Sequence, residues 1–454
     1  MFDNGFVPDE GLVGIIKPIY KNKGDPTQPE NYRPITLLSC LGKLFTSILS
    51  KRLEDYACEI NLIGETQAGF RKNYPTLDHI LTLQFLSHTL LKSKKKLFCA
   101  FVHFKQVFDT VWRNGLWYKM LENGIKGKCY TFIRNMYRGI KSKISMNGMS
   151  SNFFCCNVGV RQGENLSPFL FSIYINDLEE FLTDKNVDGL QSISSSIENE
   201  LFLYLKLSVL FYADDTVIMA ETANDLQKGL DEFHVYCSRW KLNVNVEKTK
   251  VLVFSKGPKP KNIFYYNNNV VESVNDFKYL GIVFSRSGSF CKAKKYLAEQ
   301  AQKAMYGVIR KIRQFNLPIE QQFDLFDKVV KPVLLYGCEI WGYENLDIIE
   351  RVHLKFLKYI LCMKSSTPSY MVYGESGPFP LSLTINSRMV SYWAKMLQGQ
   401  ENKIVSAVYR YLFSRYNNEN VNLWISFIQQ IPVDFQIFGQ IKLLQCLMSN
   451  GSLL

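Results

Sequence analysis

Two adjacent carboxylates, Asp214 and Asp215, stand between two apolar runs, Leu207 to Phe211 and Thr216 to Ala220. A strand, a tight turn that carries the Asp pair and a returning strand explain this pattern. Carboxylate oxygens are the hard ligands that magnesium requires, and carboxylates on neighbouring strands form a natural cage for divalent ions. A solvated hairpin turn gives the same pattern. The chemistry of the pair therefore depends on the residues around it.

Five further blocks of characteristic residues flank the Asp pair. They are Glu65 to Lys72 (ETQAGFRK), Phe101 to Arg113, Arg161 to Pro168 (RQGENLSP), Asn245 to Thr249 (NVEKT) and Tyr279 to Gly281 (YLG). Together with Phe211 to Asp215 (FYADD), they resemble, in the same order, the motifs of the reverse transcriptases of non-LTR retrotransposons. The resemblance covers residues 12–285 well and the rest of the chain more loosely. Six blocks in the right order make it specific.

This resemblance implies an RNA-directed DNA polymerase with an α+β, right-hand polymerase fold of fingers, palm and thumb. An antiparallel palm sheet would be backed by helices. Residues 1–285 would form the fingers and palm, and residues 286–345 a basic, helical, thumb-like region. Residues 346–454 would form a helical carboxy-terminal region of unknown role. The partners that the resemblance implies are an RNA template, a DNA primer and deoxynucleoside triphosphates.

The resemblance also implies two magnesium ions, with manganese as a possible substitute. Two such ions activate the primer 3′-hydroxyl and steady the leaving pyrophosphate. In the family, one direct ligand is the first Asp of the hairpin, here Asp214, and Asp215 supports the site. Both are therefore expected to be catalytic and metal-binding. The other direct ligand in the family is an Asp near the end of the first palm strand.

The chain departs from the family at that strand end. The family pattern is an Asp, four residues and then Phe-Asp, whereas here His103 precedes Phe108-Asp109. An imidazole is a borderline donor without negative charge, and it cannot bridge two magnesium ions. Asp109 lies six residues further on, and its family counterpart is not a ligand. A partly buried imidazole, a manganese-tolerant site and a drifted copy of a mobile element all remain open, and each lowers the expected catalysis.

Several substrate contacts carry over from the resemblance. Arg71 and Lys72 would bind the incoming triphosphate, because guanidinium and ammonium groups suit phosphate oxygens. Phe108 occupies the position of the steric gate that excludes a ribose 2′-hydroxyl. Lys248 would be catalytic and help to protonate the leaving pyrophosphate.

Two further blocks would contact the substrates through their backbone. Gln162 and Gly163 precede a helix, and glycine permits close approach of the backbone to the nucleotide or template. Tyr279, Leu280 and Gly281 resemble the primer-grip hairpin, which holds the primer end against the palm.

Positive charge is concentrated in one segment. The chain carries a net charge of +13, and residues 256–315 hold twelve Lys/Arg against three Asp/Glu, so +9 of the +13 lies there. This concentration is typical of a polyanion-binding surface. Phosphate contacts are expected from Lys292, Lys294 and Lys295.

The composition favours an intracellular protein of the nucleus or cytoplasm. The eleven cysteines are an odd number without a C-x-x-C pair, which predicts neither a disulfide framework nor a zinc site. Acidic residues interrupt any signal peptide. The most apolar window, Leu201 to Ala220, contains Lys206 and two aspartates, so no membrane partner is expected. About ten residues precede residue 12, where the resemblance begins, so the endonuclease domain that commonly heads relatives of this family is not expected in this sequence.

Hydrophobic periodicity predicts the elements that position these blocks. Helices are predicted at Leu37 to Ala57, Leu77 to Leu91, Leu116 to Leu121, Lys128 to Ile140, Leu166 to Leu182 and Ala223 to Trp240. Strands are predicted at Val13 to Tyr20, Leu97 to Val102 and Lys250 to Phe254, with a hairpin of Ser142 to Met146 and Phe153 to Val158 around Asn147-Gly148. Gly189 to Asn199 is predicted to be a loop and Gly257 to Pro260 a turn. After Ser285 strand signals fade, and amphipathic helices are expected around Leu297 to Ile312 and Ile349 to Tyr359.

A second interpretation stays open beside the polymerase. The chain could be a catalytically inactive, nucleic-acid-binding remnant of a retrotransposon with the same fold, and His103 is the residue that distinguishes the two.

Overall fold

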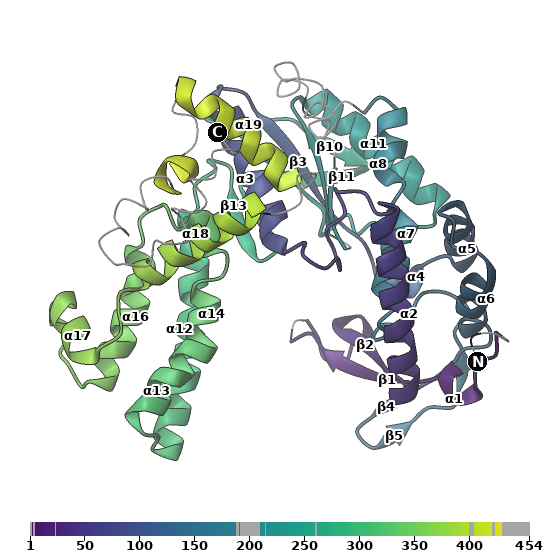
Figure 1. The fold of residues 1–454 in the computed structure, drawn as a ribbon, viewed down its shortest axis with the longest axis horizontal. Coiled ribbons are helices and arrows are strands. Elements are labelled where there is room, and N and C mark those ends of the chain that lie inside the picture. Colours follow the sequence, from purple (N-terminus) through teal and green to yellow (C-terminus); the bar gives the residue numbers. More distant parts are fainter. Residues whose placement is uncertain are drawn as a thin grey trace.

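The computed structural model describes residues 2, 5–22, 24–187, 190, 209–213, 215–258, 261–398, 404–419 and 423–428. The ribbon forms an open arch (Figure 1), in which a central sheet joins two arms that extend to the same side. The amino-terminal strands and helix α2 form one arm, and the helices from α12 to α17 form the other.

A six-stranded sheet with the order β10-β11-β9-β3-β8-β7 lies at the top of the arch. Its strands are β3 (Leu97–His103), β7 (Val209–Tyr212), β8 (Asp215–Ala220), β9 (Lys250–Phe254), β10 (Phe264–Tyr266) and β11 (Asn269–Val274). The central strand β3 is antiparallel to both β8 and β9, whereas β9 and β11 pair in parallel. Residues 97–102 are buried, which explains the uninterrupted apolar run predicted to be a strand.

Strand β3 separates two hydrophobic cores. Alternate residues face opposite sides of a sheet, and Phe98, Ala100 and Val102 belong to one core while Leu97, Cys99 and Phe101 belong to the other. The first core is closed by the helices α5 (Arg113–Glu122), α6 (Gly127–Met136), α7 (Ser167–Ile175), α8 (Leu178–Asp184) and α11 (Ala223–Arg239). The second core contains α3 (Thr76–Lys92) and the carboxy-terminal helices.

The amino-terminal arm carries a second sheet with the order β2-β1-β4-β5, on which β6 also pairs with β4. Its elements are α1 (Asp9–Leu12), β1 (Val13–Tyr20), η1 (Pro29–Asn31), β2 (Tyr32–Leu37), α2 (Cys40–Glu59), β4 (Lys141–Met146), β5 (Met149–Ser150) and β6 (Phe154–Cys155). The predicted turn is present, since Asn147 and Gly148 both have positive φ, 50° and 82°. Of the predicted second strand, Phe153 to Val158, only β6 is a strand, and the further short strand β5 pairs with β4 directly after the turn.

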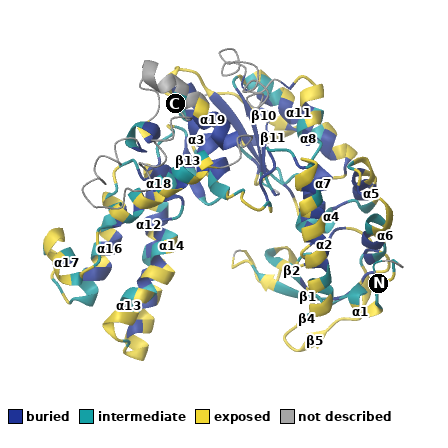
Figure 2. Cartoon of the chain, viewed as in Figure 1, coloured by how far each residue is buried: buried dark blue, intermediate teal, exposed yellow. Residues whose placement is uncertain are grey.

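Helices dominate the other arm. They are α12 (Cys291–Phe315), α13 (Ile319–Leu325), the π-helix η2 (Phe326–Val330), α14 (Lys331–Leu334), α15 (Cys338–Trp341), α16 (Asp347–Ile360), α17 (Ser369–Ser376), α18 (Leu381–Gln398) and α19 (Ile404–Glu419). The last strands, β12 (Asp276–Tyr279) and β13 (Ile282–Ser285), form a separate hairpin before α12. Helix α12 packs on α16, and α15 packs on α18, so helices on both sides of residue 345 share one core. Figure 2 shows buried residues gathered in the central strands and exposed ones along both arms.

The single helix predicted from Leu166 to Leu182 was wrong, because the structure breaks it into α7 and α8. The break falls at Asn176, whose side chain donates to the Leu62 carbonyl at 2.7 Å and accepts from the Gly64 amide at 3.0 Å. These two bonds hold Asn176 against the backbone of Leu62 and Gly64 at the point where α7 ends. The other predicted helices and strands of residues 13–285 differ from the observed ones by a few residues at their ends.

Two predicted connections fall wholly or partly on residues that the structure does not describe. The predicted loop Gly189 to Asn199 and the end of the Gly257 to Pro260 turn lie outside the described residues. Within the described part of the chain, no helix is both long enough and apolar enough to cross a membrane. The cysteines of that part are free thiols.

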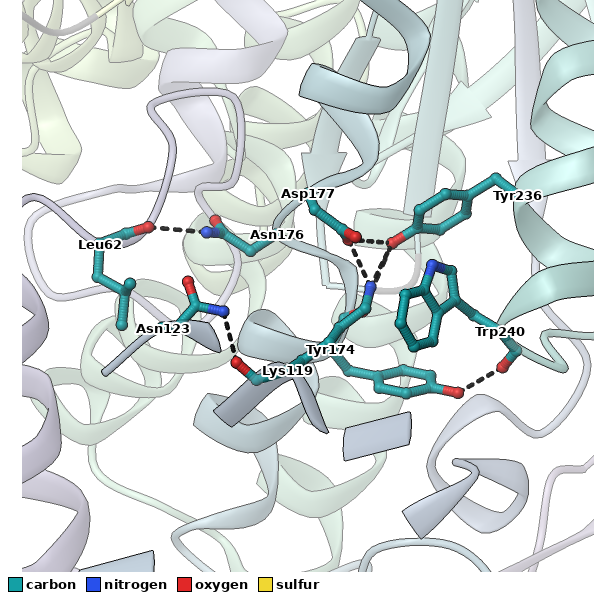
Figure 3. Close-up of polar contacts among 8 residues, drawn as sticks. All are labelled: Leu62, Lys119, Asn123, Tyr174, Asn176, Asp177, Tyr236 and Trp240. Carbon is teal, nitrogen blue, oxygen red and sulfur yellow. Dashed lines mark hydrogen bonds and ion pairs between the residues drawn. The ribbon is translucent and has the colours of Figure 1, made fainter. Parts of the chain in front are cut away.

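A buried lysine links three of the helices behind the central sheet (Figure 3). Lys119 of α5 donates to the Tyr174 carbonyl at 2.5 Å and the Tyr236 hydroxyl at 2.8 Å, and it forms an ion pair with Asp177. Its ammonium also lies 3.8 Å from the centroid of the Trp240 ring. Burial lowers the pKa of Lys119 to about 8, against the opposing effect of Asp177. These contacts fix α5, α7 and α11 to one another on the far side of the site described next.

Candidate active site

The predicted hairpin is formed by strands β7 and β8, with Tyr212 opposite Asp215 at its end. Asp214, the first residue of the predicted carboxylate pair, lies outside the described residues. Ala213 adopts a left-handed conformation with φ of 61°. A Cβ atom at Gly69 would lie 2.1 Å from the Ala213 nitrogen, so only glycine fits against this turn.

The glutamine of the first block joins the hairpin to the fingers segment. The Phe211 amide donates to the Thr66 carbonyl at 2.9 Å, and the Ala68 amide donates to the Phe211 carbonyl at 3.0 Å. The Gln67 Oε1 accepts from the Ala213 amide at 3.4 Å, in the turn itself. Residues 66–68 therefore form an isolated β-bridge beside Phe211 and hold the end of the β7–β8 hairpin.

His103 faces Asp215 at the edge of the sheet. The two residues are paired in the register of β3 and β8, and the His103 Nδ1 lies 3.6 Å from the Asp215 Oδ1. Their side chains are 35% and 46% exposed. The departure from the family pattern thus lies beside the second carboxylate of the predicted pair.

The Asn245 to Thr249 block holds the end of β3. The Asn245 amide donates to the His103 carbonyl at 2.8 Å, and the His103 amide donates to the Thr249 hydroxyl oxygen at 3.2 Å. The Thr249 hydroxyl in turn donates to the Asn245 carbonyl at 2.8 Å. Both backbone polar groups of His103 are therefore satisfied by this turn, which fixes the residue at the strand end.

A cavity of about 220 Å³ opens at this edge of the sheet. It is lined by Phe101, Val102, His103, Asp215, Thr216, Lys248, Phe277, Lys278 and Tyr279. Four sequence-predicted positions from four separate blocks therefore meet in one place: His103, Asp215, Lys248 and Tyr279. The Tyr279 hydroxyl is buried without a hydrogen-bond partner among the described residues, and burial raises its pKa well above the usual value.

Arg71 and Lys72 have different environments. The Arg71 guanidinium donates to the carbonyls of Gly64 and Gln67 at 2.8 and 3.1 Å and to the Glu65 carboxylate at 3.4 Å. Lys72 is exposed. The arginine therefore braces its own loop, whereas the lysine is available to a ligand.

Phe108 lies half-buried between two other aromatic rings. Its ring centroid is 6.1 Å from that of Phe70 and 5.2 Å from that of Phe171. It is the second residue of a short helix, α4 (Val107–Thr110), which follows Gln106 in a left-handed conformation. Aromatic packing thus holds the predicted steric gate between the fingers segment and α7.

Gln162 and Gly163 connect Asp109 to the amino-terminal sheet. The Gln162 side-chain amide donates to the Asp109 carboxylate at 3.3 Å, and the Gln162 carbonyl accepts from the Thr36 amide of β2 at 3.0 Å. Gly163 has φ of 102°, and a Cβ atom there would lie 2.8 Å from the Thr36 carbonyl oxygen. Burial raises the pKa of Asp109 to about 6, with Lys21 opposing the shift.

The predicted primer grip is a tight hairpin. Strands β12 and β13 are joined through Leu280 and Gly281, with φ of 44° and 89°. Tyr336 of the helical arm donates to the Leu280 carbonyl at 2.8 Å, and its hydroxyl lies 3.2 Å from that of Thr76 in α3. Tyr279 ends β12 and lies in the cavity described above. The hairpin is therefore held by Tyr336 of the helical arm, which also contacts α3.

The basic segment is not uniformly available to a polyanion. Lys294, expected from the sequence to contact phosphates, is buried, pairs with Glu344 at 2.8 Å and donates to the Asn345 carbonyl at 2.9 Å. That expectation was wrong, because its ammonium is neutralised inside the protein. Lys292 is exposed but pairs with Asp276 at 2.6 Å.

The solvent-facing side of α12 carries the remaining charge. Exposed cations along it are Lys292, Lys295, Lys303, Arg310, Lys311 and Arg313. The opposite side of the helix carries buried residues, including the predicted Leu297, Ala301, Val308 and Ile312. The helix is therefore amphipathic, with a basic outer face.

Three residues with structural roles at the site were missed. Gln67 and Thr249 lie inside two of the blocks, but roles were predicted only for their neighbours Arg71, Lys72 and Lys248. Their burial, 2% exposed for Gln67 and 0% for Thr249, is visible only in the structure; the sequence signal was their place inside the blocks. Tyr336 lies in no block, and the sequence around it gives no sign that its hydroxyl meets Leu280.

A family model described as reverse transcriptase (RNA-dependent DNA polymerase) matches residues 19–284, which is more than half of the chain. The chain belongs to the reverse transcriptase family. It is 24% identical over 381 residues to the RNA-directed DNA polymerase from the mobile element jockey of Drosophila melanogaster, covering 82% of this chain and 39% of that protein. It is 26% identical to a probable RNA-directed DNA polymerase from the transposon BS of the same organism, covering 77% and 38%.

These relatives are longer than the chain. It spans about two fifths of the length of the reverse transcriptases to which it was compared. A solved telomerase from Candida tropicalis, in complex with a fragment of telomeric RNA, is also similar, with a TM-score of 0.45 and 13% identity over 89% of this chain and 65% of that one. The family assignment follows from the family model and from the named relatives of non-LTR retrotransposons.

Reverse transcriptases use divalent metal ions, and the described donors can be tested against that need. Among the described residues, no group of three or more His, Cys, Asp or Glu side chains could hold a metal ion. His103 and Asp215 supply one imidazole and one carboxylate at the strand ends. Magnesium prefers hard oxygen ligands in octahedral geometry. His103 and Asp215 by themselves therefore do not fit a cage for two magnesium ions, and Asp214, the expected direct ligand, lies outside the described residues.

Proposed function

We propose that this reverse transcriptase is an RNA-directed DNA polymerase of a non-LTR retrotransposon whose magnesium-dependent reaction is impaired by His103. Its substrates would be an RNA template, a DNA primer and deoxynucleoside triphosphates. The observation that supports the impairment is the pairing of His103 with Asp215, 3.6 Å apart at the end of the two central strands.

The negative charge at this edge of the sheet determines how well it can bind divalent ions. When bound, divalent ions activate a primer hydroxyl and stabilise the leaving group. A carboxylate at position 103 would place a second hard, anionic donor opposite Asp215. The imidazole supplies one borderline nitrogen donor instead. The affinity of the site for magnesium is therefore expected to fall, whereas the strand geometry remains intact.

The remaining residues keep the roles that their positions support. Lys72, exposed beside the braced Arg71, would contact the triphosphate, and Phe108 would limit the space at the sugar. Lys248 lines the cavity with His103 and could donate a proton to the leaving group.

The backbone segments of the site would position the two strands. Gln162 and Gly163, packed on β2, would contact the nucleotide or template, and Tyr279 to Gly281 would hold the primer end. We also propose the division into fingers and palm (1–285), thumb (286–345) and carboxy-terminal region (346–454), with the basic face of α12 following the duplex.

A second candidate function is a nucleic-acid-binding protein without useful polymerisation. The basic face of α12 favours it, since phosphate contacts supply affinity independently of the strand ends around His103. The two functions differ only in whether the bound primer is extended.

The decisive experiment is primer extension on an RNA template by the natural chain and by His103→Asp. The natural chain should extend the primer in magnesium at a rate at least about 100-fold below that of His103→Asp, since even ligand-orienting neighbours of a metal contribute about 10–100-fold. When manganese replaces magnesium, the extension rates of the natural chain and His103→Asp should differ less, because manganese accepts imidazole as a ligand more readily.

Template–primer binding, measured by fluorescence anisotropy, serves as the control and should be equal for the two forms. If the His103→Asp variant binds template–primer but does not extend the primer, the second candidate function, nucleic-acid binding without polymerisation, is favoured. Brisk extension by the natural chain in magnesium would refute the proposed impairment.

A further inference from the structure

A second cavity lies at the far end of the central sheet, at the start of α12. Its volume is about 720 Å³. It is lined by Ser255, Lys256, Gly257, Asn275, Asp276, Ser285, Arg286, Ser287, Ser289, Cys291 and Lys292. Serine hydroxyls and three cations therefore surround a single space, in a combination that no block of the sequence indicated.

The charge of this cavity is positive. Lys256, Arg286 and Lys292 line it against one acid, Asp276, which pairs with Lys292. Within the described part of the chain, the side chains of Lys256 and Arg286 have no hydrogen-bonding or ionic partner. Two cations thus face the cavity without a counter-charge, which favours an anionic ligand.

A buried hydroxyl also lacks a partner there. Ser255 lines the cavity and is only 4% exposed, yet its Oγ has no hydrogen-bond partner among the described residues. A buried polar group that forms no hydrogen bond costs about 1–3 kcal/mol. A ligand oxygen in the cavity is one way to satisfy it, and the hydroxyl can donate to such an oxygen.

The backbone around the cavity is held in place. The Ser255 amide donates to the Arg286 carbonyl at 3.1 Å, and the Arg286 amide donates to the Asn275 carbonyl at 2.9 Å. The Ser285 hydroxyl donates to the Ser289 carbonyl at 2.8 Å. The end of β9 and the turn after β13 therefore present Ser255 and Arg286 from one fixed framework.

The cavity also meets the amino-terminal end of the 25-residue helix α12. Such an end carries partial positive charge and exposed amide donors, and it attracts anions. Glu344 already accepts from the Phe290 amide at 3.1 Å and pairs with Lys294 at 2.8 Å. Glu344 is not part of the cavity lining, so the side with the serines remains open to a ligand.

We infer that this cavity binds a phosphate group, through Lys256, Arg286 and the Ser255 hydroxyl. Phosphate matches every donor present, because it carries charge and several acceptor oxygens and pairs well with guanidinium. The source favoured by the fold is a backbone phosphate of a bound nucleic acid, and this choice of source rests on the proposed function. Free phosphate or pyrophosphate would use the same donors.

The distance between the two cavities gives this site a measurable property. Phe254 pairs with Leu97 at one end of β3, whereas His103 lies six residues away at the other end. At about 3.3 Å per residue, the phosphate cavity lies roughly 20 Å from His103. At about 3.4 Å per nucleotide, this corresponds to roughly six base pairs from a primer end held at the palm.

The first test compares Arg286→Gln with Lys328→Gln. Both remove one positive charge, but Lys328 is 71% exposed, pairs with Asp324 and lies outside the cavity. Binding of RNA–DNA hybrids is measured by fluorescence anisotropy against salt concentration, with upstream duplexes of about 4 and about 10 base pairs. Arg286→Gln should reduce the salt slope by about 0.7–0.9 on the longer hybrid and leave the shorter one unchanged. Lys328→Gln should change neither.

The second test uses inorganic phosphate as the probe. Thermal melts in phosphate and in chloride at equal ionic strength should show that phosphate stabilises the natural chain, because a ligand that binds only the folded state raises its stability. Arg286→Gln and Ser255→Ala should reduce this effect, and Lys328→Gln should retain it. Ser255→Ala removes no charge, so its effect separates the cavity from general electrostatics.

The outcomes separate the two sources of phosphate. If Arg286→Gln lowers the salt slope only on the hybrid with the longer duplex, the site binds a backbone phosphate. A phosphate effect on melting without any dependence on hybrid length assigns it to a free anion. If Arg286→Gln behaves like Lys328→Gln in both tests, no phosphate site exists. Neither test involves nucleotide incorporation, so failure of polymerisation would leave the phosphate site standing, and the converse also holds.

Discussion

The imidazole of His103 and the carboxylate of Asp215 lie directly opposite each other on strands β3 and β8, with Nδ1 and Oδ1 3.6 Å apart. An aspartate at position 103 would place two anions at this separation. In water, like charges about 4 Å apart repel by about 1 kcal/mol, and exposure keeps the effect small.

We therefore predict that His103→Asp lowers the free energy of unfolding by about 1 kcal/mol or less when metal ions are absent. Thermal or urea melts in the presence of a chelator measure the change. His103→Asn is the control, because it is neutral and should not show the loss. A higher melting temperature for the Asp form would contradict the prediction.

Asp109 provides a prediction about pH. Its pKa is about 6 in the folded protein, mainly because it is buried, against 3.8 as the ordinary value. The folded state then binds the proton more tightly than the unfolded state, so stability falls as pH rises from about 4 to about 6. The destabilisation by the ionised Asp109 carboxylate is absent below about pH 4 and complete above about pH 6.

Asp109→Asn should therefore stabilise the protein at pH 7.5 by roughly 1 kcal/mol, after allowance for partial exposure, and the gain should vanish near pH 4. The asparagine oxygen can still accept from Gln162, so the hydrogen bond at 3.3 Å is not lost. Chemical denaturation across this pH range measures the gain. An equal gain at both pH values would show that the carboxylate is not destabilised by burial.

The buried pair behind the sheet predicts an asymmetry between its two members (Figure 3). The side chain of Lys119 is 1% exposed, whereas that of Asp177 is 40% exposed. Asp177→Ala leaves a buried cation without its counter-charge, which typically costs about 3–5 kcal/mol. Lys119→Met leaves a carboxylate that water reaches and that still accepts from the Tyr236 hydroxyl at 2.6 Å.

We predict that Asp177→Ala is more destabilising than Lys119→Met at pH 7 by at least about 1 kcal/mol. The loss in Asp177→Ala should shrink above about pH 8. The reason is that the folded state disfavours the charged lysine, whose pKa lies below that of an unfolded chain, so stability rises as the lysine loses its proton. Urea melts at pH 7 and pH 9.5 test both statements. Equal losses for the two variants would mean that the ion pair does not hold these helices.

Local patterns predicted much of the fold, and the family resemblance indicated the four positions that meet at the cavity, His103, Asp215, Lys248 and Tyr279. Strand β3 was predictable because a strand buried on both faces has an uninterrupted apolar sequence, here residues 97–102. The hairpin of β7 and β8 was predictable from two apolar runs around a turn. His103 was located at the strand end by its place in a block, and the register with Asp215 agrees with that place.

Long-range contacts account for what could not be predicted. The helix break at Asn176 depends on bonds to Leu62 and Gly64, more than a hundred residues earlier. Lys294 lies on the apolar face of α12, three residues before Leu297 and seven before Ala301, so periodicity separates it from the exposed Lys295. Its partner Glu344, which neutralises the buried ammonium, could not be predicted. Periodicity reports which side of an element is apolar, but not which distant polar group it will meet.

The same limit applies to the fingers block, where Arg71 and Lys72 were assigned one shared role. The structure gives them different environments. Arg71 donates to two carbonyls and a carboxylate of its own loop, and that loop holds the β7–β8 hairpin through Gln67. Lys72 is exposed.

We predict that the two alanine variants fail in different ways in the His103→Asp background. Arg71→Ala should lower the free energy of unfolding by about 1–3 kcal/mol, because it leaves buried loop carbonyls unpaired, and it should lower kcat as the hairpin loosens. Lys72→Ala should leave stability unchanged within about 0.5 kcal/mol. It should raise the KM for the nucleotide, because an exposed lysine contributes to binding the triphosphate rather than to the loop.

Single-nucleotide extension with varied nucleotide concentration, together with urea melts, separates these effects. Arg71→Lys is the informative companion variant, since it keeps the charge but cannot reproduce the several directed bonds of the guanidinium. If Arg71 acts on the triphosphate by charge alone, Arg71→Lys should retain the KM of the parent and its stability. If Arg71 braces the loop, Arg71→Lys should be destabilised almost as much as Arg71→Ala, because the carbonyls of Gly64 and Gln67 lose their shared donor.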